Sequence, residues 1–290
     1  MLPITFTFAY AAFSDELIPY IMQEFAENGA ENLVLSSYLI SRILQKPGLL
    51  FELEKALQAN GLRFVDAHNP FGLYLDLNVP QPALRGIMLE RHKLALRIAA
   101  HFGVKTTAVH VGNLNMQIFP EYGLEQVHAA ALRSLEELLP LAEELDVCLA
   151  LENIWCPTNT PERLQDLMAR CPSSHLGLCY DSGHANLMTK DQKLENCGVI
   201  QQWQGIEPIA YDKNILKKML PEIVNCHLHD NDGISDLHKL PGQGSVDWQE
   251  VKTLLAQAPR LQCIQAEVRT VPDRLSIARL CRQFKEFFQK

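Results

Sequence analysis

Short apolar, β-rich segments alternate with amphipathic segments along nearly the whole chain of 290 residues. Most of the apolar segments are near-continuous runs, which is typical of strands that are covered on both faces. This alternation predicts an α/β fold with a parallel sheet. The eight predicted strands are 4–10, 32–37, 63–69, 106–112, 147–154, 175–181, 224–230 and 263–268.

Between these strands, apolar residues recur every three or four positions, which predicts helices. One helix is predicted to begin at the N-cap residue Ser14 and to end at Gly29. Another is indicated by the capping-box spacing of Asp247 and Glu250. The helical pattern covers 83–103, 124–145, 245–258 and 272–289, and it is least clear over 185–223, where we expect a long loop and a short helix.

Eight β/α units without a linker or low-complexity tract predict one domain, residues 1–290, folded as a single (β/α)8 TIM barrel. A doubly wound open sheet is the alternative, but no glycine-rich dinucleotide turn follows the first predicted strand. The difference matters because a barrel brings the C-terminal ends of all its strands to one mouth.

Composition and charge indicate the class and compartment of the protein. A hydrophobic fraction of 47% is ordinary for a soluble globular enzyme, and no window of the chain predicts a transmembrane helix or a signal peptide. The eight cysteines form no CxxC pair, and several lie in apolar runs. We therefore expect buried thiols in a reducing, cytoplasmic compartment. The net charge of −8 argues weakly against a nucleic-acid partner.

Ionisable side chains gather at or just after the C-terminal ends of the predicted strands. Burying so many of them without a counter-charge is costly, and a divalent metal ion supplies that charge. Imidazole and carboxylate ligands suit Zn²⁺ or Mn²⁺ best, with Co²⁺, Fe²⁺ or Mg²⁺ as alternatives. The residues are His68, His110, Glu152, Asp181, His184, His227, His229, Asp236, His238 and Glu267.

The remaining histidines are predicted to have no role in chemistry. His92, His101 and His128 lie inside predicted helices. His175 begins a predicted strand, at the end of the barrel opposite the mouth.

The segments ALEN, CYDSGHAN, HLHDNDGISDLHKLPGQGSVDW and QAEV resemble the xylose isomerase-like TIM-barrel superfamily. Its members include sugar (phosphate) isomerases and epimerases, inositol-catabolism dehydratases and metal-dependent abasic-site endonucleases. The resemblance covers nearly the whole chain, and the segment DAHNPFGLYLDLNVP is similar to the third-strand loop of the isomerase and epimerase members. These motifs imply the barrel and a metal site, and they leave the reaction open.

The resemblance implies two ligand sets. In the isomerases and epimerases one metal ion is bound, which implies Glu152, Asp181, Glu267 and one of His227 and His229 as ligands here. In the abasic-site endonucleases three zinc ions are bound by nine ligands. The nine matching residues are His68, His110, Glu152, Asp181, His184, His227, Asp236, His238 and Glu267.

These observations predict a metal-dependent isomerase or epimerase that acts on a small sugar, sugar phosphate or polyol-derived carbonyl compound. Glu152 and Glu267 are the predicted catalytic residues, which move a proton next to the carbonyl group. Trp155 and Phe71 are candidates for an apolar wall. The predicted metal ligands are Glu152, Asp181, His227, Glu267, Asp236 and His238. The predicted substrate contacts are His68, His110, His184, His229, Trp155, Lys239 and Arg269.

An abasic-endonuclease-like phosphodiesterase with a multinuclear zinc site is the alternative. Such an enzyme needs basic residues in its loops to hold phosphates. The segment 37–48, interpreted as the loop after the second strand, has one Arg and one Lys, and 69–82 has neither. A carbohydrate is therefore favoured over a nucleic acid as the partner, and a homodimer remains open because barrels of this type often pair.

Overall fold

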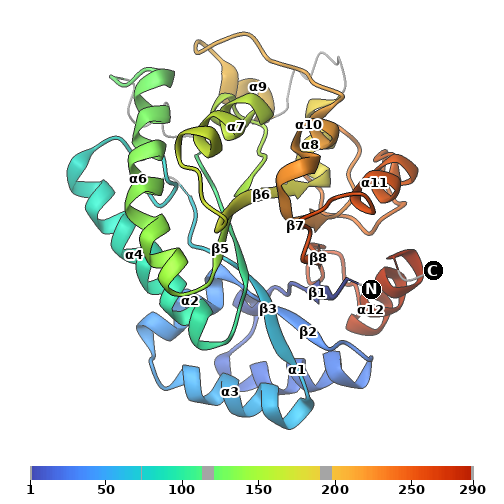
Figure 1. Ribbon diagram of the computed structural model, residues 1–290. Helices are drawn as coiled ribbons and strands as arrows, with labels where there is room; N and C mark the ends of the chain where they lie inside the picture. Colours follow the sequence, from blue (N-terminus) through green and yellow to red (C-terminus); the bar gives the residue numbers. More distant parts are fainter. Residues whose placement is uncertain (1, 73, 113–120, 190–197, 289–290) are drawn as a thin grey trace.

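The computed structural model describes residues 2–72, 74–112, 121–189 and 198–288. Eight parallel strands form a closed barrel in chain order, which confirms the predicted (β/α)8 fold (Figure 1). Strand β8 pairs with β1 to close the barrel, with Thr5 opposite Gln265. The strands are β1 (Ile4–Phe6), β2 (Asn32–Leu35), β3 (Arg63–His68), β4 (Thr106–Val109), β5 (Cys148–Glu152), β6 (Leu176–Asp181), β7 (Ile223–Leu228) and β8 (Cys263–Ala266).

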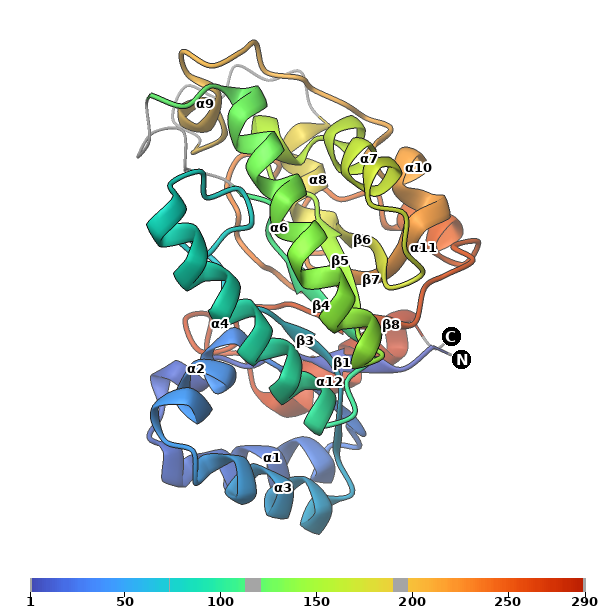
Figure 2. The same ribbon diagram turned by 60° about the vertical axis from the view of Figure 1, so that its left-hand side comes forward.

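Helices surround the barrel on its outside (Figures 1 and 2). Helices α1 and α3 pack side by side, as do α4 and α6, and α12 packs against β1. No helix in the part of the chain that the structure describes is long and apolar enough to cross a membrane. The helices are α1 (Ile18–Glu27), α2 (Ser37–Gln45), α3 (Leu49–Asn60), α4 (Pro82–His101), α6 (Leu124–Glu144), α7 (Pro161–Arg170), α8 (Ser182–Met188), α9 (Gly198–Trp203), α10 (Ile215–Met219), α11 (Trp248–Leu255) and α12 (Ile277–Phe288).

The main core lies between the outer faces of the strands and the helices. Phe6 on β1 shows how it is built, because its ring lies 5.8 Å from that of Phe25 on α1 and 6.3 Å from that of Phe284 on α12. Burying one such ring stabilises the fold by roughly 1.5–3 kcal/mol. The first strand is thus held between the first and the last α-helix. The seven cysteines in the described ranges are buried free thiols.

Inside the barrel, by contrast, the layer beneath the mouth is polar. The Asn225 side-chain amide donates a hydrogen bond to Asp66 across the barrel at 3.3 Å, and the Cys263 thiol donates one to the side-chain oxygen (Oδ1) of Asn225 at 3.3 Å. Burial raises the pKa of Asp66 to about 6, although the nearby charge of His227 opposes the shift. TIM-barrel interiors are ordinarily filled by branched apolar side chains. In this chain the polar layer lies one pleat below the histidines His68 and His227 on the same strands.

Seven of the eight predicted strands run past the observed ones at their C-terminal ends, and the sixth ends at Asp181 as observed. Strand β1 stops at Phe6, where the chain becomes half-buried, whereas β4 stops at Val109 although residues 110–112 stay buried. A run of apolar residues indicates that the chain is buried, not that it forms strand hydrogen bonds. Apolar runs therefore extend past the last residue that pairs with a neighbouring strand. The rim residues His110, His229 and Glu267 consequently follow their strands rather than end them.

Three predictions of helical structure are corrected. Segment 37–48 is not a loop but mostly helix α2, whose N-cap Ser36 accepts a hydrogen bond from the Leu39 N–H at 3.4 Å. Ser14 precedes a 3-10 turn and makes no side-chain cap, and α1 starts at Ile18. Segment 185–223 holds the end of α8, α9 and α10 instead of a single short helix. In each case short helices are fixed by contacts with neighbouring elements, which periodicity alone does not report.

Other helix boundaries agree with the prediction. The Asp247 carboxylate accepts a hydrogen bond from the Glu250 N–H at 3.0 Å and so caps α11. Gly29 and Gly103 follow α1 and α4 with φ values of 73° and 74°, the left-handed conformation in which glycine ends helices.

Candidate metal centre

The candidate ligands predicted from the sequence meet at the mouth of the barrel. Glu152 ends β5, Asp181 ends β6 and His227 lies on β7, so their side chains reach one rim because all strands are parallel. His184 lies in the first turn of α8 rather than on β6, and its backbone N–H is held by the Asp181 carboxylate at 2.7 Å. Ligand atoms within 4.8 Å of one another form three groups. These are Glu152, Asp181, His227 and Glu267; His68, Glu152 and His227; and His184, His229, Asp236 and His238.

The first group, called here the central group, consists of Glu152, Asp181, His227 and Glu267. Nδ1 of His227 lies 2.8 Å from Oε2 of Glu267 and 3.4 Å from Oε1 of Glu152. Three carboxylates and one imidazole thus surround a single point, a ligand set for one divalent ion.

The second group shares Glu152 and His227 with the central group. Nε2 of His68 and Nε2 of His110 lie 3.4 and 3.3 Å from Oε2 of Glu152. Nδ1 of His68 donates a hydrogen bond to the carbonyl oxygen of Asn69 at 2.8 Å, which leaves the lone pair on Nε2. Oε2 of Glu152 therefore faces His68 and His110, and its Oε1 faces His227.

The third group, called here the lid group, consists of His184, His229, Asp236 and His238. Nδ1 of His184 donates to the Asn153 carbonyl at 2.9 Å, and Nδ1 of His238 donates to the Glu267 carbonyl at 2.9 Å. Both rings therefore present Nε2 towards Asp236, at 4.0 and 2.9 Å. Asp236 and His238 come from the loop after β7, so this loop returns over the mouth.

The two histidines that the sequence could not separate have different positions. His227 belongs to the central group, whereas Nε2 of His229 donates a hydrogen bond to Oδ2 of Asp181 at 3.1 Å. The His229 side chain has no exposed surface, and its ring stacks on His238 with centroids 3.8 Å apart. The predicted direct contact of His229 with a substrate is therefore not what the structure shows.

Charges in the cluster are balanced by protons on the histidines. Burial alone would raise the pKa of Glu152, but the charges of His227 and His110 outweigh burial and hold it well below its ordinary value. Burial alone would lower the pKa of His184, but Asp181 and Glu152 raise it to about 10. The pKa of His238 is raised to about 9 against burial, chiefly by its hydrogen bond to Asp236. A divalent ion would replace these protons as the counter-charge.

The residues present fit a divalent metal ion. Five buried ligand atoms make no hydrogen bond of good geometry among the described residues: Oε2 of Glu152, Oε2 of Glu267, Oδ1 of Asp236 and both ring nitrogens of His227. Nδ1 of His227 and Oε2 of Glu267 are close, at 2.8 Å, but are not aligned as a hydrogen bond. Buried polar atoms without partners are rare in proteins, and a bound ion is one explanation for them. A set of imidazole and carboxylate donors without a thiolate suits Zn²⁺, Mn²⁺, Fe²⁺ or Co²⁺.

Two aromatic rings, Phe71 and Trp155, lie against candidate ligands at the mouth. The Phe71 ring lies 4.8 Å from His68 and 4.6 Å from His110, and 47% of this residue is exposed. The Trp155 ring meets His184 edge-on at 4.7 Å. Both rings therefore touch candidate metal ligands and offer an apolar surface beside them.

The two predicted cationic contacts are less well placed. Nζ of Lys239 donates a hydrogen bond to the Asp273 carboxylate at 2.9 Å. Arg269 is exposed, and its backbone N–H, rather than its side chain, donates to the carbonyl oxygen of His238 at 2.9 Å. Lys239 is thus already engaged in an ion pair, and Arg269 contributes through its backbone.

Sequence reasoning missed the residues that hold the ligands. Asn153 brackets Asp181, accepting a hydrogen bond from its N–H at 2.8 Å and donating one to its carbonyl at 3.0 Å. The buried carboxylate of Asp230 accepts hydrogen bonds from the Trp248 indole at 2.8 Å and from the Gly242 and Val246 N–H groups at 2.9 and 3.1 Å. Asn153 directly follows Glu152 in the chain, and Asp230 directly follows His229. This position next to a candidate ligand is the sequence feature that could have identified them.

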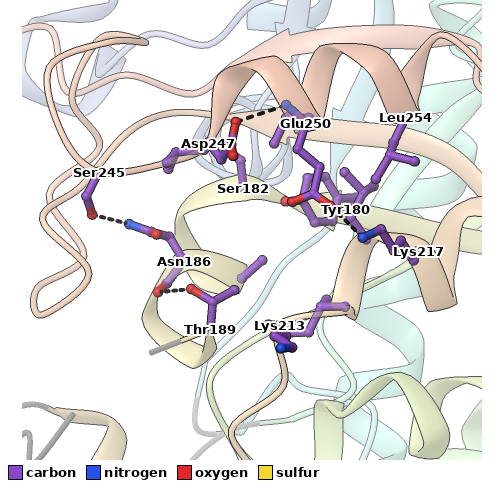
Figure 3. A pocket seen from close by; sticks show the side chains of 15 residues that line it. Tyr180, Ser182, Asn186, Thr189, Lys213, Lys217, Ser245, Asp247, Glu250 and Leu254 are labelled. Atoms are coloured by element: carbon purple, nitrogen blue, oxygen red, sulfur yellow. Dashed lines mark hydrogen bonds and ion pairs between the residues drawn. The ribbon is translucent and has the colours of Figure 1, made fainter. Parts of the chain in front are cut away.

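A pocket of about 180 Å³ lies between α8, α10 and α11, outside the three ligand groups (Figure 3). It contains the ion pair of Lys217 with Glu250, 2.7 Å apart, and the hydrogen bond from the Asn186 amide to the Ser245 hydroxyl, 3.0 Å long. None of its lining residues is a candidate ligand. The candidate active site is therefore the mouth of the barrel.

A family match and similar solved structures agree with this fold. Residues 33–278 match the family described as xylose isomerase-like TIM barrel, and the chain belongs to this family. The uncharacterized protein MJ1311 of Methanocaldococcus jannaschii is 24% identical over 229 residues, which cover 76% of this chain and 69% of that protein. A D-tagatose 3-epimerase-like protein is similar in structure, with a TM-score of 0.74, 18% identity and coverage of 100% of this chain and 97% of that chain. The IOLI protein with a bound zinc atom has a TM-score of 0.70, 16% identity and coverage of 99% and 96%. At these identities the two structures show a shared fold.

Proposed function

We propose that this protein is a metal-dependent isomerase or epimerase that acts on a small polyhydroxylated carbonyl compound. The observation that carries the proposal is the central group, in which Glu152 at the end of β5 and Glu267 just after β8 face the same His227 nitrogen. Two carboxylates that approach one point from different strands can serve opposite faces of a bound substrate. The similarity to an epimerase-like protein and to a zinc-containing barrel supports the proposal.

The two glutamates differ in accessibility, which assigns their roles. The Glu267 side chain is 23% exposed, whereas that of Glu152 is 2% exposed. The pKa of Glu267 is lowered, because the charge of His227 outweighs the effect of burial, so this carboxylate is ionised at neutral pH. Glu267 is the group that takes the proton next to the carbonyl, and Glu152 acts on the opposite face.

A bound divalent ion supplies positive charge that polarises the carbonyl group and stabilises the developing negative oxygen. The chain orients the ligands for it: Asn153 holds Asp181, and His68 is fixed by its hydrogen bond to the Asn69 carbonyl. Phe71 and Trp155 flank the site and can cover the apolar face of a sugar carbon chain.

Exchange of substrate protons with solvent tests this proposal across a range of candidate substrates. The protein is loaded with Mn²⁺, Co²⁺ or Zn²⁺ and incubated in D₂O with a panel of ketoses, ketose phosphates and inosose-type ketones. We expect deuterium to enter at a carbon next to the carbonyl of at least one panel member, followed by NMR, and chelation to stop it. Metal-loaded protein that exchanges no such proton in any panel member contradicts the proposal.

A phosphodiesterase is the second candidate, and the observation that favours it is the convergence of all nine predicted ligand positions at one rim. Three zinc ions per chain by elemental analysis, together with cleavage of DNA at abasic sites, would establish it. The basic residues of segment 37–48 do not support it, because Arg42 and Lys46 both pair with Asp15, at 2.5 and 3.3 Å. One exchangeable ion per chain and intact abasic-site DNA would exclude it.

A further inference from the structure

His229 is a buried histidine of the lid group that also contacts the central group. Its ring edge meets Asp181 of the central group, with Nε2 3.1 Å from Oδ2. Its ring face stacks on His238 of the lid group, with centroids 3.8 Å apart and planes 12° apart. A single side chain therefore contacts a ligand of each group.

The backbone of His229 is held by hydrogen bonds, and its ring is closely packed. The Ser182 hydroxyl donates a hydrogen bond to the His229 carbonyl at 2.7 Å and accepts one from its N–H at 3.0 Å. Gly183 lies against the ring so closely that a Cβ there would stand 1.9 Å from Cε1 of His229. This packing determines where Nε2 points, as is expected for a group that orients a metal ligand.

Because the rings of His229 and His238 are stacked, the two residues are not suited to binding one ion together. This favours a role for His229 in orienting other ligands. The lone pair of an imidazole lies in the plane of its ring. The lone pairs of two stacked rings therefore lie in separate, parallel planes and do not meet at one point. Nε2 of His238 faces Asp236 at 2.9 Å, whereas Nε2 of His229 faces Asp181. The two rings therefore serve different carboxylates.

We propose that His229 is a positioning residue that holds Asp181 and His238 at the same time, so that the central group and the lid group form together. The inference rests on the proposed metal centre. It adds that the two groups are coupled through one ring, so that losing this ring weakens metal binding in both. A hydrogen bond that orients a metal ligand typically changes metal affinity by about 10- to 100-fold.

The test uses two amide variants that differ in where the donor lies. H229Q places an amide N–H near the position of Nε2, whereas H229N places it near Nδ1, on the side away from Asp181. H229L keeps the bulk of the ring and removes the donor. Metal-depleted protein is titrated with Co²⁺, whose visible absorption reports the geometry of each bound ion, and affinities come from competition with a chelator. H175Q is the matched control, because His175 pairs with Asp146 on the surface, away from the ligand groups.

We expect H229L and H229N to lose about 10- to 100-fold in Co²⁺ affinity, with an altered spectrum at both ligand groups. H229Q is expected to recover most of the affinity for the central group, and H175Q to match the wild type. Equal Co²⁺ affinities for H229N and H229Q, or a wild-type spectrum in H229L, would overturn this inference and leave the proposed function standing. A wild-type protein that binds no Co²⁺ overturns both the inference and the proposed function.

Discussion

Nδ1 of His227 lies 2.8 Å from Oε2 of Glu267, although the two residues come from different β/α units of the barrel. Opposite charges held this close in a largely buried site favour the ionised carboxylate and the protonated imidazole. Accordingly, the pKa of His227 is raised well above its ordinary value despite burial, with Cys179 and Glu267 as the groups that raise it. In the proposed mechanism, the ionised Glu267 carboxylate is the group that would accept the substrate proton.

Replacing Glu267 by Gln should abolish proton exchange with a sugar substrate while the fold stays intact. The amide keeps the shape of the side chain but cannot take a proton, and general-base catalysis contributes about 10²- to 10⁴-fold in rate. Deuterium incorporation and circular dichroism measure the two effects. E250Q is the control, since Glu250 pairs with Lys217 outside the ligand groups. Exchange at the wild-type rate in E267Q would rule out the two-glutamate mechanism.

The stability of the metal-free protein should fall as the pH rises from about 6.5 to 10. The pKa values of His184 and His238 are raised from 6.5 to about 10 and about 9 in the folded state, against burial, by neighbouring carboxylates. Groups with raised folded-state pKa values stabilise the fold fully below the unfolded value, and this contribution is lost as the pH passes the folded values. Metal affinity should rise over the same range, because a metal must displace these protons.

Urea unfolding with and without Zn²⁺ across this pH range measures both trends. Zinc at 100 times its dissociation constant should add about 2.7 kcal/mol to the free energy of unfolding. A metal-free stability that is constant from pH 6.5 to 10, or a metal affinity that is highest at low pH, would contradict the charge balance described for the cluster.

Replacing Gly183 by Ala should weaken both metal binding and stability. The new Cβ would stand 1.9 Å from Cε1 of His229, so the ring must move away from Asp181. Overpacking of this kind typically costs about 1–3 kcal/mol. Gly86 in α4 is the matched control, since a Cβ there meets nothing within 4 Å. G86A should instead stabilise the protein by roughly 0.5–1 kcal/mol, because alanine favours the helix more than glycine does and its Cβ meets no neighbour.

Thermal unfolding and Co²⁺ titration of the two glycine variants distinguish these outcomes. If G183A bound Co²⁺ as the wild type does and unfolded at the same temperature, the His229 ring would not be held against Gly183 as the structure describes.

Replacing Asp230 by Ala should loosen the loop that carries Asp236 and His238. The Asp230 carboxylate accepts hydrogen bonds from the Trp248 indole and from the backbone N–H groups of Gly242 and Val246. Removing this carboxylate leaves buried donors without a partner, and each of them lowers the free energy of unfolding by about 1–3 kcal/mol. Urea unfolding measures the loss, and limited proteolysis locates it in the loop.

A double-mutant cycle with W248F tests the contact of Asp230 with Trp248 directly. Phe keeps the ring but lacks the indole N–H, so D230A should cost less in W248F than in the wild type. Strictly additive effects would mean that the 2.8 Å hydrogen bond contributes nothing to stability.

Much of the architecture followed from periodicity, because eight buried runs separated by amphipathic segments are compatible with few folds. The rim location of Glu152, Asp181 and Glu267 followed as well, since parallel strands carry their C-terminal residues to one face. Helix α2 was misread as a loop, because nine residues with mixed polarity have little intrinsic preference and are held by packing.

Local patterns in the sequence were enough to predict a barrel whose mouth holds many ionisable side chains, because strand and helix periods and strand polarity are local properties. The pairing of each histidine with its carboxylate depends on tertiary contacts. His227 and His229 are two residues apart and leave β7 on the same face, so their local patterns are equivalent. Their roles differ because His227 faces Glu152 and Glu267 from other strands, whereas Ser182 and Gly183 of α8 turn the His229 ring onto Asp181. Those contacts join residues that lie far apart along the chain, and only the closed barrel brings them together.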